Sequence, residues 1–451
     1  MTTPLVPALN FSQDTLTQVA QTVLALAQRK GATAVEAEVS EGVGQGVTVR
    51  LGEVETIEYN GDKSVGITVY VGQKKGHAST ADFSEAALNS AVEAALNIAR
   101  YTAEDPFAGL PDADRLARGT LPDLDLFHPW ALPVEAAIAL AQEAEAAGQA
   151  VDARIDNSEG ATVNVSLGQF VYANSQGFCQ GYTSSRHSLS VVLLAEDNDS
   201  MQRDYWYSSA RHPNDLRPAA EVGRIAGERA VRRLNARRIK TGQYPVLFEA
   251  PLAAGLIGHF VGAVSGGALY RKSSFLLDSL GTSVFAPCVT LREDPFVLRG
   301  MSSSPFDAEG VAVAPRVVVE KGVVQGYFLS SYSARKLGMV TTGNAGGSHN
   351  LLLDSTGEDF AALLQRMGTG LLVTELLGHG VNPVTGDYSR GAAGYWVENG
   401  VLAYPVEEIT IAGNLREMFG RIEAIGTDAL PQSSTRTGSI LISEMTVAGE
   451  G

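Results

Sequence analysis

The histidines are the first candidates for catalytic chemistry, because imidazole is the side chain that most often binds a metal ion. The chain has seven, at positions 77, 128, 187, 212, 259, 349 and 379. No two of them stand at HExxH spacing, which a zincin site would require. His259, His349 and His379 share the C-terminal half of the chain. A self-sufficient hydrolase built on these three therefore remains an alternative, although single scattered histidines are more often hydrogen-bonded structural residues.

A polar, glycine-rich loop between apolar strands is the most unusual block of the sequence. It lies in residues 374–413 and carries five closely spaced hydrogen-bonding side chains, those of His379, Asn382, Asp387, Tyr388 and Arg390. Such a concentration of donors and acceptors indicates a surface that faces a substrate or a partner. The alternative is structural: Asp387 and Arg390 pair to pin the loop, and Asn382 with the following proline starts a turn.

The first element expected to position these groups is an N-terminal α+β unit, residues 1–104. Apolar periodicity predicts helices over 13–30 and 83–100. Between them, alternating residues predict an antiparallel meander over 35–79. Turn residues should divide the meander at Gly42, Asn60-Gly61 and Gly72.

The same order of elements is then expected a second time. Five prolines in residues 105–133 indicate a connector on the surface. In the unit that follows, residues 134–240, a helix is predicted over 134–148, strands over 152–207 and a second helix over 218–235. The repeated order suggests an internal duplication, which sequence identity between the two units is too weak to establish.

The third region, residues 241–451, reads as a mostly β domain with a few embedded helices. Hairpin turns are expected at 320–322 and 398–400. The stretch between Glu249 and Arg271 has no charged residue, but glycine and alanine make it a poor membrane span. It is predicted to be a helix buried in a globular domain, whose glycines let another backbone approach closely. The whole chain is thus expected to have an α+β fold.

Charge and cysteine content restrict the functional classes. The 34 Lys and Arg against 50 Asp and Glu give a net charge of −16, which argues against direct contact with nucleic acid. The densest basic stretch, residues 224–240, is explained as a helix end that gains cations to complement its dipole. Only two cysteines, Cys179 and Cys288, occur, and residues 1–14 do not resemble a signal peptide. A cytoplasmic protein that does not enter the membrane is expected.

The third region also resembles a known family. The resemblance covers nearly all of the chain after Tyr244, and the layout before it fits the same family. It rests on the segments Gly258–Gly267, Tyr270–Ser279, Ser304–Asp307, Ser331–Gly338 and Gly386–Gly400. On these segments the chain is identified as a member of the TldD/PmbA family of metallopeptidases, formerly described as modulators of DNA gyrase, and it is most similar to the PmbA (TldE) branch.

The resemblance implies that this chain does not bind the family's zinc. TldD-type relatives have an HExxxH motif whose histidines hold zinc and whose glutamate is a general base, and a cysteine near the C-terminus completes the ligand set. The corresponding stretch here begins at Phe248-Glu249 and ends at Ala253, so both ligand positions are apolar. Residues 433–439 contain no thiol. Glu249 is then a remnant base or a group presented to a partner's site; the alternative is an acidic residue in the first turn of a helix, favoured there by the helix dipole.

The resemblance further implies a function at the level of a complex. The chain would be the inactive subunit of a peptidase that cleaves or trims unfolded or linear peptides. A TldD-type partner in a heterodimer would supply zinc, and the chain could form a homodimer when alone. The alternative is a non-enzymatic regulatory or binding protein that acts as a homo-oligomer.

Overall fold

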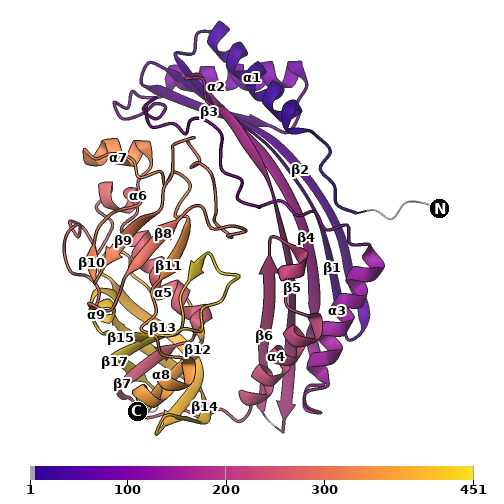
Figure 1. Cartoon of the computed structure of the whole chain (residues 1–451), viewed down its shortest axis with the longest axis vertical. Helices are drawn as coiled ribbons and strands as arrows, with labels where there is room; N and C mark the ends of the chain where they lie inside the picture. Colours follow the sequence, from indigo (N-terminus) through magenta and orange to yellow (C-terminus); the bar gives the residue numbers. More distant parts are fainter. Residues whose placement is uncertain (1–5, 199, 450–451) are drawn as a thin grey trace.

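The computed structural model describes residues 6–198 and 200–449 (Figure 1). The prediction that residues 1–14 are not a signal peptide therefore concerns a segment that lies partly outside the described residues. A long curved sheet occupies one side of the molecule, and a β-rich domain formed by the C-terminal half occupies the other. Helices and strands occur in both parts, which confirms the predicted α+β class.

The first unit has two helices and three strands. They are α1 (Gln13–Arg29), β1 (Ala34–Arg50), β2 (Glu53–Val71), β3 (Lys74–Thr80) and α2 (Glu85–Tyr101). The hydroxyl groups of Ser12 and Ser84 accept hydrogen bonds from the first turns of the two helices and fix where they begin.

Two of the predicted turns in this unit are wrong. Gly42 and Asn60-Gly61 lie inside continuous strands, and the chain instead reverses at Leu51-Gly52, where both residues have positive φ. The turn at Gly72 is confirmed. The strands continue through the glycines because they pair along their whole length, and at Gly44 a Cβ atom would lie 2.5 Å from the Asn60 side chain.

The second unit repeats the order of the first. Its elements are α3 (Val134–Gln149), β4 (Asn157–Asn174), β5 (Cys179–Asp197), β6 (Ser200–Ala210), the 3₁₀ turn η1 (Pro213–Asp215) and α4 (Ala219–Arg232). The strands of both units form one antiparallel sheet in the order β3-β2-β1-β4-β5-β6. Because β1 and β4 are equivalent strands that pair antiparallel at the centre, the arrangement fits a duplicated unit. Helices α1 and α2 cover one end of the sheet, and α3 and α4 cover the other.

The connector between the units lies only partly at the surface: residues 112–115 and 118–120 are exposed, as expected, but others are not. Leu110, Leu116, Leu124 and Leu126 are buried. The Arg335 guanidinium, from the C-terminal domain, donates to three carbonyl oxygens of the connector, those of residues 107, 109 and 110. Apolar residues between the prolines anchor the segment between the sheet and the C-terminal domain, which composition alone does not reveal.

The C-terminal domain contains two sheets. Its strands are β7 (Gly242–Phe248), β8 (Leu291–Asp294), β9 (Arg316–Glu320), β10 (Val323–Val324), β11 (Asn350–Leu353), β12 (Gly370–Leu377), β13 (Asp387–Glu398), β14 (Val401–Asn414), β15 (Ile422–Ile425), β16 (Thr435–Arg436) and β17 (Ile440–Ala448). One sheet has the order β10-β9-β8-β11-β16. The other runs β14-β13-β12-β7-β17-β15 and is closed into a barrel by pairing of β14 with β17. Both predicted hairpins, β9–β10 and β13–β14, are confirmed.

Short helices complete this domain, and one of them contradicts a prediction. The helices are α5 (Ala250–Ala263), α6 (Gly266–Tyr270), α7 (Ser331–Leu337), α8 (Phe360–Met367) and α9 (Leu415–Gly420). One face of α5 packs into the core, as predicted. The glycines at 255, 258 and 262 lie on the opposite, exposed face, where an added Cβ atom would meet nothing within 4 Å. Among the described residues, no helix is long and apolar enough to cross a membrane.

Candidate functional site

The stretch that corresponds to the zinc motif lies where β7 ends and α5 begins. Phe248 is the last residue of β7 and Ala253 lies in the first turns of α5; both have 0% exposure. Their side chains belong to the main hydrophobic core of the C-terminal domain. A metal held from these two positions would be enclosed in apolar side chains and could not meet a substrate. The residues present here do not fit a zinc centre.

Glu249, between these two positions, forms an ion pair with a residue of the other half of the molecule. Its carboxylate oxygens accept hydrogen bonds of 2.7 and 3.2 Å from the Arg229 guanidinium, near the end of α4. Burial raises the pKa of Glu249 above its ordinary value, and the Arg229 charge opposes this. Its position at the N-cap agrees with the structural interpretation, but the carboxylate contacts Arg229 instead of capping the helix.

This ion pair is part of a buried network that joins the two halves. Asp204 of β6 accepts a 3.2 Å hydrogen bond from Arg229 and lies 3.7 Å from Arg233. Arg233 in turn contacts Glu375 of β12. Charges therefore alternate along the network, and α4 and β6 are fixed to β7, α5 and β12. Sequence analysis missed this network, because Arg229 and Arg233 were explained by the helix dipole alone.

The first backbone N–H group of α5 finds its hydrogen-bond acceptor in the C-terminal part of the chain. The Ser439 hydroxyl accepts a 3.1 Å hydrogen bond from Ala250 N and donates a 2.7 Å bond to Asp428. Asp428 also accepts a 2.8 Å bond from Ser439 N. The region where the resemblance places a cysteine ligand in TldD-type relatives is thus occupied here by groups that fix the start of a helix.

Two metal-binding side chains on α5 could meet a metal ion from solvent only if they lay on the exposed face of this helix. Three of its positions are glycine, at 255, 258 and 262. Beside them lies His259, which is half-buried with its ring 6.0 Å from that of Tyr388. Burial lowers the pKa of His259, and the nearby Arg390 charge acts in the same direction. One imidazole alone does not make a zinc site.

The polar loop predicted to face a substrate or partner is held largely by its own turn. Asn382 Oδ1 accepts a 2.9 Å hydrogen bond from Val384 N, and Asn382 N donates to the Asp387 carbonyl. Asp387 accepts a 2.6 Å bond from the Thr385 hydroxyl. The Asn382 turn of the structural interpretation is therefore present, whereas within the described part of the chain the Asp387 carboxylate contacts Thr385 and Asn414 and makes no ion pair with Arg390.

The other predicted residues of this loop separate into buried and exposed ones. Tyr388 is buried beneath the loop, and burial raises its pKa to about 12 against the Arg390 charge. His379 is exposed. Of the candidate residues, His379 is the best placed to meet another molecule.

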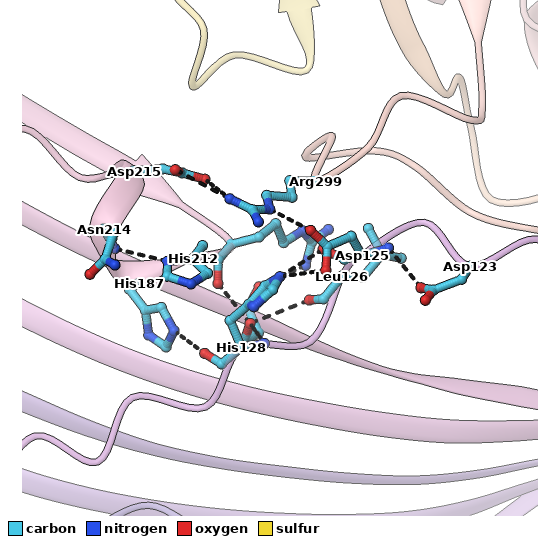
Figure 2. A network of polar contacts seen from close by, with 11 residues as sticks. Asp123, Asp125, Leu126, His128, His187, His212, Asn214, Asp215 and Arg299 are labelled. Carbon is cyan, nitrogen blue, oxygen red and sulfur yellow. Dashed lines mark hydrogen bonds and ion pairs between the residues drawn. The ribbon is translucent and has the colours of Figure 1, made fainter.

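The three histidines of the hydrolase alternative have separate environments. His349 is buried and contacts the Gly343 carbonyl, His259 lies on α5 and His379 lies in the loop after β12. Throughout residues 6–198 and 200–449, no three His, Cys, Asp or Glu side chains gather as metal ligands would. The structure instead gathers histidines that sequence analysis did not single out, His128, His187 and His212, which come from three separate segments (Figure 2).

A cavity of about 330 Å³ lies next to the ion-pair network. It is bounded by β5 and β6 on one side and by α5 and β12 on the other. The lining includes Arg203, Tyr205, Leu252 and Thr374. Among the described residues, the buried Thr374 hydroxyl has no hydrogen-bond partner. The cavity thus combines apolar side chains with charged and polar ones, among them Asp204, Arg233 and Glu375 of the network.

Comparison with known proteins supports the resemblance seen in the sequence. Family profiles match in three parts: PmbA/TldA metallopeptidase domain 1 over residues 35–99, the central domain over 127–234 and the C-terminal domain over 241–449. The chain is 48% identical to "Metalloprotease PmbA" of Escherichia coli O157:H7, with 96% of each chain covered. It is 46% identical to "Metalloprotease PmbA homolog" of Haemophilus influenzae, with 98% of each chain covered.

Solved structures agree with these relatives. A protein from Bacteroides thetaiotaomicron, named as a modulator of DNA gyrase, matches with a TM-score of 0.91 at 27% identity, over 96% of this chain and 98% of that one. TldE from Thermococcus kodakarensis shares the fold, with a TM-score of 0.84 at 19% identity over 96% of this chain and 100% of that one. On the sequence profiles and the close relatives together, this chain belongs to the PmbA/TldA metallopeptidase family.

Proposed function

We propose that this chain is the PmbA/TldE-type subunit of a two-chain cytoplasmic metallopeptidase that cleaves or trims unfolded or linear peptides. A TldD-type partner supplies the zinc and the hydrolytic water. The observation that carries this proposal is the state of the zinc-motif positions. Phe248 and Ala253 lie in the core, and the Glu249 carboxylate is held by Arg229. A general base must reach a substrate proton, and this carboxylate is already engaged.

The role left to this chain is to hold the substrate and to complete the enclosure around it. The cavity beside the ion-pair network combines Tyr205 and Leu252 with the polar ends of Arg203 and Thr374. An extended peptide could place a side chain there and align its backbone with a neighbouring strand. A shared internal space would admit a flexible chain and exclude a folded protein.

The part of β2 that β3 leaves uncovered, at one edge of the large sheet, supports the proposal of a partner. Residues 53–64 of β2 pair with β1, but β3 pairs only with residues 65–71, so that no other described strand covers this edge. Val54 and Ile57 on it are 43% and 45% exposed. A long exposed edge with apolar side chains is a site of strand addition. Because Glu53, Glu55 and Glu58 line the same edge, pairing with a second copy would oppose like charges, and a partner strand with lysine or arginine fits better.

The test is reconstitution of activity from separately purified subunits. We expect the isolated chain to leave an unfolded peptide intact with added zinc, and the mixture with a TldD-type partner to cleave it until a chelator is added. The control is a partner whose zinc-binding histidines are replaced by alanine. Chelator-sensitive cleavage by this chain alone, free of partner, would refute the proposal, as would full activity of the partner without this chain.

A further inference from the structure

A second pocket, of about 250 Å³, lies between the second unit and the C-terminal domain, and it shares no lining residue with the cavity beside Glu249. Its walls are the end of β6 with the segment after it, and two segments of the C-terminal domain: the loop residues 298–301, and residues 431–436, which end in β16. Figure 2 shows two of its lining residues, Arg299 and Asp215, and the hydrogen bonds that the Arg299 guanidinium donates to Asp215 and to Asp125. The proposed function assigns it no role.

Positive charge is concentrated in this pocket, although the chain as a whole carries −16. Four guanidinium groups line it, those of Arg211, Arg217, Arg299 and Arg436, against the single carboxylate of Asp215. Two of these cations are compensated. Arg217 pairs with Glu221 at 2.5 Å, and Arg299 pairs with Asp125 at 2.6 Å and Asp215 at 3.0 Å.

The other two cations, Arg211 and Arg436, have no carboxylate partner in the described part of the chain. Arg211 donates only to carbonyl oxygens, those of Ser185 at 3.0 Å and Met301 at 2.8 Å. Its Nε and the Nε of Arg436 are buried without an acceptor, and so is the Nε2 amide of Gln432, which also lines the pocket. Burial lowers the pKa of Arg211, in keeping with a guanidinium that lacks a counter-charge.

Such an arrangement is costly unless something compensates it. A buried donor without an acceptor destabilises the folded chain, and a partly buried cation without a counter-charge adds to that cost. A bound anion would supply both the missing charge and the missing acceptors. Guanidinium groups present planar pairs of N–H donors that match carboxylate and phosphate oxygens.

We propose that this pocket binds one oxyanion, with Arg211, Arg436 and the Gln432 amide as its donors. The volume suits a carboxylate or phosphate group with a short attachment. Two sources have this chemistry: the C-terminal carboxylate of a peptide, and free inorganic phosphate. The proposal does not depend on peptidase activity, because the pocket is formed by this chain alone.

The experiment is calorimetric titration of the full chain with three probes. They are inorganic phosphate, N-acetyl-Ala-Ala with a free carboxylate, and the same dipeptide with a C-terminal amide. We expect saturable binding of at least one anionic probe and none of the amide. Tighter binding of the dipeptide would indicate a peptide C-terminus as the ligand, and tighter binding of phosphate would indicate an inorganic anion.

Variants locate the binding. Arg436→Met should weaken binding about tenfold or more, since a charge-assisted hydrogen bond contributes about 1.5–3 kcal/mol. Gln432→Leu should weaken it less, and Arg416→Met, at an exposed arginine of α9 outside the pocket, should not change it. Circular dichroism checks that each variant folds. If Arg436→Met does not fold, the affinity of Gln432→Leu for the anion tests whether binding occurs in this pocket. Absence of saturable binding, or unchanged affinity in the pocket variants, would overturn the proposal.

Discussion

At the scale of single residues, Glu249 is a structural ion-pair residue in this chain. Removing one member of a buried pair leaves the other uncompensated, which typically costs about 3–5 kcal/mol. The Glu249 side chain is 19% exposed, so for Glu249→Gln we expect a loss of about 2–4 kcal/mol in the free energy of unfolding, measured by urea titration. Glu228→Gln, which breaks the more exposed pair with Arg224, should change it by less than about 1 kcal/mol. Unchanged stability with loss of peptidase activity in the reconstituted complex would instead make Glu249 a catalytic residue.

His187 makes the stability of the chain sensitive to acid. It has 0% exposure; its Nε2 lies 2.8 Å from the His128 carbonyl, and its Nδ1 has no described partner. Burial lowers its pKa; the hydrogen bond to the His128 carbonyl opposes this, and the His212 and His128 rings lower the pKa further. The unfolded chain therefore binds a proton more readily than the folded one, so stability is full above the ordinary histidine pKa and is lost as pH falls through it.

The corresponding measurement is the urea midpoint at pH 7 and pH 5. We expect a fall for the natural chain and a smaller fall for His187→Gln, which keeps an N–H donor and removes the titrating ring. His128 lies against Asp125 and the His212 ring, and Trp130 packs against His187, so these neighbours remain the same in both proteins. His379→Gln, in the exposed loop, is the control. Equal pH dependence in the natural chain and His187→Gln would contradict this assignment.

Residue types could be predicted from the sequence better than their environments. The apolar character of positions 248 and 253 follows directly from the sequence, and the structure adds that both are core residues. The partner of Glu249 could not be predicted, because Arg229 lies on a helix of a different unit and meets it only when the two halves dock. The histidines of Figure 2 were missed for the same reason.

At the scale of elements, glycine has opposite roles in two helices. Where α3 and α4 cross, a Cβ atom at Gly223 would lie 1.8 Å from the Ala144 carbonyl oxygen. On α5, a Cβ atom at Gly255 would meet nothing. The close approach predicted for the α5 glycines therefore occurs at the α3–α4 contact, which a single helical stretch of sequence could not show.

This contrast gives a matched pair of substitutions. Gly223→Ala should destabilise the chain by about 2–3 kcal/mol, because the helices must move apart. Gly255→Ala should stabilise it by about 0.5–1 kcal/mol, because alanine restricts the unfolded chain and fits the exposed helix. Thermal unfolding of both variants measures these effects. A destabilising Gly255→Ala would show that this face of α5 is covered.

Helix bounds followed from the sequence to within a few residues, because local caps such as Ser12 and Ser84 set them. Strand bounds around Gly42 and Gly61 did not, because cross-strand pairing over the whole of β1 overrides local turn preference. Asn399-Gly400, in contrast, is a turn in both the prediction and the structure, since the two strands beside it pair directly with each other.

At the scale of the whole molecule, the order of units could be predicted and their arrangement could not. The two N-terminal units share one sheet through the β1–β4 pairing, which joins residues more than a hundred positions apart. Parts of the connector are buried because the C-terminal domain contacts it, and neither contact leaves a local pattern in the sequence.

The exposed edge of β2 gives a prediction at this scale. Ile57→Lys should weaken association with a TldD-type partner about tenfold or more, because it adds a charge to the proposed pairing edge. Val401→Lys, at a position of β14 that is 61% exposed, is the control and should associate normally. Size-exclusion chromatography of the mixed subunits measures both. Normal association of Ile57→Lys would place the partner on another surface.

The claim on which this account most depends is that the chain has no zinc centre of its own, and metal content measures it directly. The purified chain, free of any partner, is dialysed to equilibrium against micromolar zinc, and its bound metal is counted by mass spectrometry. We predict much less than one zinc per chain, with no change in His259→Ala. One tightly held zinc per chain, released by that substitution, would contradict the account.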